Sequence, residues 1–234
     1  MIIYENIDKT ELIKTLPELW NPLSEEQRTF LLDNIEIRTF KKNEPIYREN
    51  EKPEHLMCLM KGKVKIHIEG ICNHSQIVRI IGDKGLFGYR AAFAGEDYLT
   101  GASAFEDSMI CLIPIDVIKK LISENNKLAT YFIKQLARML GEADINTVNL
   151  SQKHIRGRLA DALLLLKDKY GTEDDSVTLN ISPSREDIAT MSNMTTSNAI
   201  RTLSAFASEC LIATEGKKIK IIDEQELQNI SKQG

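Results

Sequence analysis

The chain has 234 residues, which exceeds one typical small domain and predicts one domain plus a smaller one. Apolar residues make up 42% of the sequence and charged residues 27%, values that are usual for a water-soluble globular protein and too apolar for a disordered chain. The 30 basic and 34 acidic side chains give a net charge of −4, which argues against a polycationic nucleic-acid tail but not against a local basic face.

The sequence carries no segment typical of a membrane protein or a secreted protein. Its longest apolar run, Leu159 to Leu166, is interrupted by Asp161 and is far shorter than the ~18–20 residues that cross a bilayer. The four cysteines form no CxxC pair, which excludes zinc-finger spacing: Cys58, Cys72, Cys111 and Cys210. We therefore expect a cytoplasmic protein with free thiols, no metal site and no membrane contact.

The N-terminal part predicts one helix followed by strands. Ser24 and Gln27 have capping-box spacing at the start of a helical run that ends near Leu32. After Ile35 the apolar period changes to two, and glycines between Gly62 and Gly101 separate short segments. We expect an antiparallel barrel or jelly roll over residues 35–113.

Helical patterning then extends from Pro114 to about Tyr170. Within it, seven residues recur at alternating spacings of three and four, and all but Asn146 are apolar: Ala129, Phe132, Leu136, Met139, Ala143, Asn146 and Leu150. Such a heptad seam favours the association of two copies, with Asn146 as the polar position that fixes their register. The alternative is a helix that covers its own barrel. A further helix, Arg156 to Tyr170, ends at Gly171.

The segment that follows predicts two capped helices joined by a short turn. Ser184 and Asp187 have capping-box spacing, and Thr195 begins a second, longer helix. We expect the second helix to bury four residues: Ala199, Ile200, Leu203 and Phe206. Its exposed residues would then be small and polar, with one arginine, which is typical of a helix-turn-helix that enters the major groove. The alternative is a three-helix domain with no nucleic-acid role.

Residues 211–222 predict a hairpin of two short strands around a Glu-Gly-Lys turn. Lys217 and Lys218 would make this hairpin a basic wing beside the second helix.

These segments together resemble a transcription regulator of the Crp/Fnr superfamily over nearly the whole chain. The most specific part runs from Ser184-Arg185-x-Asp187-Ile188-Ala189 through Arg201-x-Leu203 to Leu211-Ile212. The resemblance implies an α+β fold: an N-terminal antiparallel jelly-roll or double-stranded β-helix barrel (residues 1–125), a long dimerisation helix (126–152) and a C-terminal winged helix-turn-helix (153–234). It also implies a homodimer that binds double-stranded DNA at an inverted repeat and is not an enzyme. The barrel would sense an unknown small-molecule effector, and an activator would also contact RNA polymerase.

The resemblance assigns two sets of DNA contacts. The base-facing residues would be Thr196, Ser197 and Arg201, and Arg201 could give a guanine two parallel hydrogen bonds. The phosphate contacts would be Ser184, Arg185, Thr195, Asn198, Lys217 and Lys218. The family often has a glutamate where Ser197 stands, so we expect an operator different from the best-known ones.

An effector site would lie at Gly88, Tyr89, Arg90, Tyr98 and Thr100. Members that bind cyclic nucleotides have a glutamate after the roll's glycine and an Arg-Ser pair later, and both are missing here. We therefore expect no tight binding of cyclic AMP. No cysteine precedes Cys58, so an iron–sulfur cluster is not expected either. Haem stays open as an alternative, because four residues could offer an axial ligand: His55, His67, His74 and Cys72.

The sequence gives less support to two other functions. A ligand-binding module whose C-terminal domain contacts proteins has only the acidic net charge in its favour. An enzymatic function has less support. The neighbouring carboxylates of Glu96 and Asp97 would point to opposite faces of an extended segment, which is poor geometry for paired acid–base catalysis. No nucleophile, phosphate-binding or metal motif accompanies them.

Overall fold

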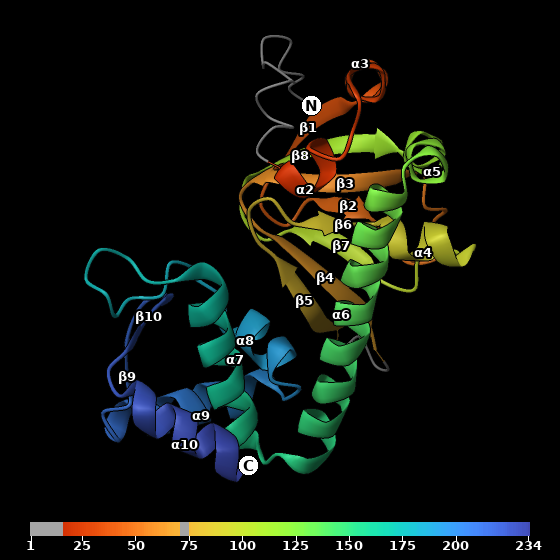
Figure 1. The fold of residues 1–234 in the computed structure, drawn as a ribbon. Helices are drawn as coiled ribbons and strands as arrows, with labels where there is room; N and C mark the ends of the chain where they lie inside the picture. The colour runs from red at the N-terminus through yellow and green to blue at the C-terminus, as the bar shows by residue number, and fades with distance from the viewer. Residues whose placement is uncertain (1–15, 71–74) are drawn as a thin grey trace. The chain divides into compact units, whose positions relative to one another are not determined.

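A computed structural model describes residues 16–70 and 75–234 (Figure 1). The described residues form two compact units, one of residues 16–69 and 78–140, the other of residues 70, 75–77 and 141–234. The N-terminal part is a β-roll with flanking helices, and the C-terminal part contains helices and one hairpin, so the expected α+β class is confirmed.

The roll consists of two four-stranded sheets. The first has the order β1-β8-β3-β6, from strands β1 (Glu36–Phe40), β8 (Ser108–Pro114), β3 (His55–Lys61) and β6 (Leu86–Phe87). The second has the order β2-β7-β4-β5, from strands β2 (Pro45–Tyr47), β7 (Gly101–Ala104), β4 (Val64–Glu69) and β5 (Ser75–Ile81). The recorded registers of the roll strands are antiparallel, which confirms the expected jelly roll.

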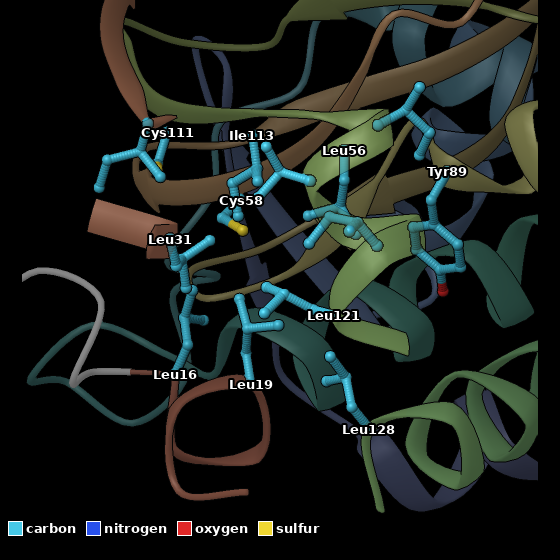
Figure 2. Close-up of a cluster of buried hydrophobic side chains, with 14 of the residues drawn as sticks. Leu16, Leu19, Leu31, Leu56, Cys58, Tyr89, Cys111, Ile113, Leu121 and Leu128 are labelled. Carbon is cyan, nitrogen blue, oxygen red and sulfur yellow. The ribbon is translucent and has the colours of Figure 1, made fainter. Parts of the chain in front are cut away.

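Strands β3 and β8 bury side chains on both faces. Met57 and Ile110 point into the roll, where they join apolar residues from both sheets. Cys58 and Cys111, which are register partners, point to the opposite face and into a second cluster (Figure 2). Because both faces are buried, these strands read as nearly continuous apolar runs rather than as an alternating pattern.

The second cluster is closed by helices. It packs the outer face of the first sheet against α2 (Pro17–Trp20), α3 (Glu25–Asn34), α5 (Ile115–Glu124) and the start of α6 (Asn126–Gln152). The short helix α4 (Tyr89–Ala94) contributes Tyr89 to it (Figure 2). At the start of α3 the expected capping box is confirmed: the Gln27 amide donates to Ser24 Oγ at 3.2 Å, and the Ser24 amide donates to Gln27 Oε1 at 3.2 Å.

The helical patterning expected from Pro114 to Tyr170 forms three helices, and the separate helix expected from Arg156 is confirmed. Asn125 interrupts it with an extended conformation, and its Oδ1 accepts hydrogen bonds from the amides of Lys127 and Leu128. This side chain therefore ends α5 and caps α6. Residues 153 and 154 separate α6 from α7 (Ile155–Tyr170), which ends at Gly171 as expected.

Helix α6 carries two apolar stripes, and the expected seam follows the one that packs on the roll. Phe132 is 2% exposed and lies among the rings of Tyr89 and Phe93, so its assignment to a dimer seam is wrong. Leu136 and Met139 are partly buried against the same cluster. Of the remaining seam residues, Ala143 and Asn146 are exposed and Leu150 is half-buried.

The second stripe on α6 is open. Ile133 and Leu140 are 66% and 65% exposed, and Val148 also lies in the open. With about 3.6 residues per turn, these three share one face with Ala137, and Asn146 points roughly 120° away from Leu140.

The C-terminal unit combines four helices with one hairpin: α7, α8 (Arg185–Met191), α9 (Thr196–Ser208), β9 (Ile212–Glu215), β10 (Lys218–Ile221) and α10 (Glu224–Gln233). Leu159, Leu163 and Leu166 of α7 are buried as expected, while Leu165 is exposed. Phe206 of α9 is fully buried, with the guanidinium of Arg156 over its ring at 4.9 Å.

Candidate nucleic-acid interface

Two capped helices and a tight turn form the centre of the interface. At α8 the Asp187 amide donates to Ser184 Oγ at 3.0 Å, and the Ser184 amide donates to the Asp187 carboxylate at 3.0 Å, so the expected capping box is confirmed. The Ser184 hydroxyl also donates to the same carboxylate at 2.6 Å. Since a hydroxyl has one proton, this side chain has none left for a phosphate, and its expected phosphate contact is not supported.

The turn between α8 and α9 is held from outside by Arg158. Its Nε donates to the carbonyl of Ser192 at 2.9 Å, and Nη2 donates to the carbonyl of Asn193 at 3.2 Å. Nη1 donates to the carbonyl of Lys153 at 2.9 Å. The planar fork of a guanidinium can reach several carbonyls at once, which a lysine cannot do. No local pattern in the sequence indicates this role, because the turn carbonyls belong to residues 34 and 35 positions away.

Helix α9 exposes the three residues that the sequence predicts to face the bases. Thr195 caps it by accepting a hydrogen bond from the Asn198 amide at 3.3 Å, while Ala199, Leu203 and Phe206 anchor its inner face. Thr196, Ser197 and Arg201 are exposed. Arg201 has no recorded hydrogen bond or ion pair within the described ranges 16–70 and 75–234, so its guanidinium donors are open to a ligand.

The expected burial of Ile200 is wrong. Its side chain is 48% exposed and lies at the edge of the outward face of α9, about 60° around the axis from Ser197 and about 100° from Arg201. The capped helix rotates so that Ala199 and Leu203 fill the inner face, which leaves Ile200 about 100° around the axis from Ala199.

The expected wing is confirmed. Strands β9 and β10 pair antiparallel, with Lys218 opposite Glu215. Gly216 has a φ of 59°, the positive value that a two-residue hairpin turn needs at its first position. Arg185 Nη2 donates to the Gly216 carbonyl at 3.0 Å, so the start of α8 holds the wing turn. Arg185 Nη1 is buried and has no hydrogen-bond partner among the described residues.

The two wing lysines differ. Lys217 is exposed. Lys218 Nζ lies 2.8 Å from the Glu173 carboxylate, and this hydrogen bond raises the pKa of Lys218. One of the two expected phosphate contacts is thus already paired with an acidic side chain.

The expected effector residues lie together only in part: a Cβ at Gly88 would meet the Tyr98 hydroxyl at 3.3 Å, and Thr100 hydrogen bonds with Tyr47, which stacks on Tyr98. Tyr89 lies in the helix-covered cluster, where its Oη donates to Met139 Sδ at 3.5 Å, so its assignment to an effector site inside the roll is wrong. Arg90 forms an ion pair with Glu96 at 2.5 Å. Gly88 begins α4 with a φ of 83°, and a side chain there would meet the carbonyl of His55 at 3.1 Å.

Inside the roll, Tyr98 stacks on Tyr47 with ring centroids 3.8 Å apart and planes 15° apart. Tyr98 is 4% exposed, and its hydroxyl has no hydrogen-bond partner among the described residues. Burial raises the pKa of both tyrosines, and a hydrogen bond with Thr100 partly offsets the rise for Tyr47. Charged groups surround this pair: the carboxylates of Glu51 and Glu54 act on Tyr98, and the guanidinium groups of Arg79 and Arg90 act on Tyr47.

Of the haem ligands left open by the sequence, Cys72 and His74 lie outside the described residues. Burial lowers the pKa of His55 and of His67. Across residues 16–70 and 75–234, no group of three or more His, Cys, Asp or Glu side chains could hold a metal ion. In the same residues, no helix combines the length and apolar character needed to span a bilayer.

A jelly roll joined through a long helix to a winged helix-turn-helix is the architecture of a class of DNA-binding transcription regulators. Residues 37–125 match the cyclic nucleotide-binding domain, and residues 157–230 match the Crp-like helix-turn-helix domain. The chain belongs to the Crp/Fnr family of DNA-binding transcription regulators, which are not enzymes.

Similar proteins cover most of the chain at low identity. The CRP-like cAMP-activated global transcriptional regulator of Mycobacterium tuberculosis is 23% identical over 189 residues, which cover 80% of this chain and 84% of that protein. Electron transport regulator A of Shewanella oneidensis is 26% identical over 201 residues, with 84% and 79% coverage. The structure of FixK2 from Bradyrhizobium japonicum has a similar fold, with a TM-score of 0.76, 21% identity and coverage of 84% and 96%.

Proposed function

We propose that this regulator acts in the cytoplasm as a homodimer that places one α9 in each of two successive major grooves of an inverted-repeat operator. The observation that carries the proposal is the outward face of α9, where Ser197 and the unpaired Arg201 project from a helix with a fully buried anchor, Phe206. In the dimer the two helices would lie about 34 Å apart, one turn of DNA. Lys217 is exposed and is available to flank them with a phosphate contact.

The test begins with selection of a preferred site from random duplexes. Arg201→Ala should weaken binding to that site about tenfold or more and remove the preference at one G·C pair in each half. Lys217→Gln, the matched control, should weaken all sequences alike and reduce the salt dependence. If the protein selects no sequence, or if Arg201→Ala changes neither affinity nor preference, the proposal fails and protein contacts become the better assignment for this domain.

The open stripe on α6 supports the homodimer. Ile133, Leu140 and Val148 expose apolar side chains along one face of this helix, and Ile145 is a further exposed apolar residue on another side of it. Two copies packed along this face would bury what one copy leaves in water. This seam replaces the one expected from the sequence, in which Phe132 was the first large residue.

Leu140→Glu should convert the protein to a monomer by native mass measurement and abolish operator binding, because the two halves would no longer be read together. Arg138→Glu places the same side chain on the same helix, roughly 140° from Ile133, and should stay dimeric. A dimer with Leu140→Glu would exclude this seam.

We also propose that a small effector controls the equilibrium between conformations of the dimer and that this effector is not cyclic AMP. Arg90 is already paired with Glu96, and no carboxylate follows Gly88. Calorimetry with cyclic AMP should give no saturable heat, and an approximately micromolar dissociation constant would contradict this part of the proposal.

A further inference from the structure

Helix α9 exposes one large apolar side chain in an otherwise polar face. Ile200 is 48% exposed, and its neighbours on that face, Ser197, Arg201 and Ser204, are exposed too. The core of the unit does not need Ile200, because Ala199, Leu203 and Phe206 already fill the inner side of the helix. Its γ- and δ-methyl groups therefore lie at the edge of this polar face, where they are open to a ligand that contacts the face.

We propose that Ile200 reads the 5-methyl group of a thymine in each operator half-site. The inference rests on the proposed function, since it requires α9 in the major groove. In that groove thymine is the one base that carries a methyl group, and apolar side chains recognise it by contact. Hydrogen-bonding side chains such as Ser197 cannot distinguish a thymine from the same base without its methyl group.

The position of Ile200 beside Arg201 restricts where the thymine lies. Consecutive helix residues rise by about 1.5 Å, whereas base pairs are about 3.4 Å apart along one strand. The thymine should thus fall within about two base pairs of the guanine that Arg201 contacts, on either strand. Thr196 also has a methyl group, but it lies about one turn earlier on the helix, roughly 6 Å along the axis. Its contact would therefore fall at a different base pair.

The test removes the methyl group from the DNA and the side chain from the protein separately. In the selected operator, each thymine is replaced in turn by deoxyuridine, which differs only in lacking the methyl group. The wild-type protein should lose about three- to tenfold in affinity at one position per half-site, measured by fluorescence anisotropy. Ile200→Ala should lose a similar factor on the thymine operator and show no further loss on the deoxyuridine operator at that position.

Three further variants sharpen the result. Ile200→Val keeps branched methyl groups and should retain the sensitivity to deoxyuridine. Thr196→Ala should retain it as well. Leu165→Ala removes another exposed apolar side chain of the same unit and should change nothing. Because Ile200 is outside the core, the thermal midpoint of Ile200→Ala should match that of the wild type, which shows that a loss of binding is not a loss of folding.

Two results would overturn the inference, and they differ from the failure of the proposed function. The first is that Ile200→Ala remains as sensitive to deoxyuridine as the wild type. The second is that no thymine methyl matters although Arg201→Ala removes the guanine preference, which would assign Ile200 to a protein contact. If the wild type selects no sequence at all, the proposed function and this inference fail together.

Discussion

The candidate ligand-binding residues are buried or paired in the roll, whereas in the winged helix-turn-helix they are exposed. In the roll, Tyr98 is buried against Tyr47, and Arg90 is paired with Glu96. In the C-terminal unit, Ser197 and Arg201 stand open on a helix whose other face is anchored. The difference indicates that the DNA-reading surface is formed before its ligand arrives, whereas the roll would have to rearrange to admit a polar one.

The largest expected effect tests how firmly the reading surface is preformed. Arg158→Ala removes three hydrogen bonds that end on the carbonyls of Lys153, Ser192 and Asn193. Charged hydrogen bonds contribute about 1.5–3 kcal/mol each when isolated, and since these share one side chain we expect a loss of about 2–4 kcal/mol in the free energy of unfolding. Urea unfolding followed by circular dichroism measures it.

Operator affinity should fall by about tenfold or more in the same variant although every DNA contact is retained, because the turn that aims α9 is loosened. Arg158→Lys keeps the charge but not the fork and should restore little of either quantity. If Arg158→Lys behaves like the wild type, the charge and not the clamp is what matters.

A smaller effect on stability tests whether the hydroxyl groups of the two stacked tyrosines in the roll have hydrogen-bond partners. The Tyr98 hydroxyl is buried without a partner among the described residues, whereas Tyr47 hydrogen bonds with Thr100. Tyr98→Phe should leave the free energy of unfolding unchanged or raise it by about 1 kcal/mol, and Tyr47→Phe should lower it by about 1 kcal/mol. A loss of stability in Tyr98→Phe would mean that the hydroxyl is bonded to water or to a ligand, and the contrast between roll and reading domain would then weaken.

The two units should also respond to opposite ends of the pH scale. In the roll unit, burial is the main cause that raises the pKa of Tyr131 to about 12, above its ordinary value of 10.0. In the C-terminal unit, a hydrogen bond from Thr178 is the main cause that lowers the pKa of Asp175 to about 2, below its ordinary 3.8. The raised pKa of Tyr131 stabilises the fold below pH 10, and this contribution is lost between pH 10 and about 12. The lowered pKa of Asp175 stabilises the fold above pH 3.8, and this contribution is lost between pH 3.8 and about 2.

The single tryptophan separates these responses. Trp20 lies in the roll unit, so its fluorescence reports that unit, while circular dichroism reports both. Alkaline titration should affect both signals, and Tyr131→Phe should reduce the loss. Acid titration should affect circular dichroism more than fluorescence in its Asp175-dependent part, and Asp175→Asn should remove that part. The reverse order of the two signals would contradict the assignment of causes.

The sequence predicted the features whose determinants are close together in the chain. The capping boxes at Ser24 and Ser184, the N-cap at Thr195 and the turn at Gly216 depend on residues within a few positions of each other, and all are present. The predictions that failed required a choice between two faces of one element.

Helix α6 illustrates the failure best. It has one apolar stripe through Phe132 and another through Ile133 and Leu140, and only tertiary packing decides which covers the roll. The same choice between two faces decides the burial of Ile200 and Tyr89. The role of Arg158 could not be predicted for another reason, because the carbonyls that it binds in the turn are 34 and 35 positions away in the sequence.

The smallest expected effect concerns the wing of the DNA-reading surface, whose other residues are open to DNA. Lys218 departs from this pattern, because its ammonium group lies 2.8 Å from the Glu173 carboxylate. Glu173→Gln would release this lysine, and we expect operator affinity to rise by about two- to threefold at low salt, with the slope of log affinity against log salt steeper by up to about 0.9 per half-site. Asp174→Gln removes a neighbouring charge that forms no ion pair with any residue the structure describes, and it should raise affinity less, through the general field alone. If both variants behave alike, the ion pair opens at no cost when DNA arrives, and Lys218 belongs with Lys217 among the free contacts.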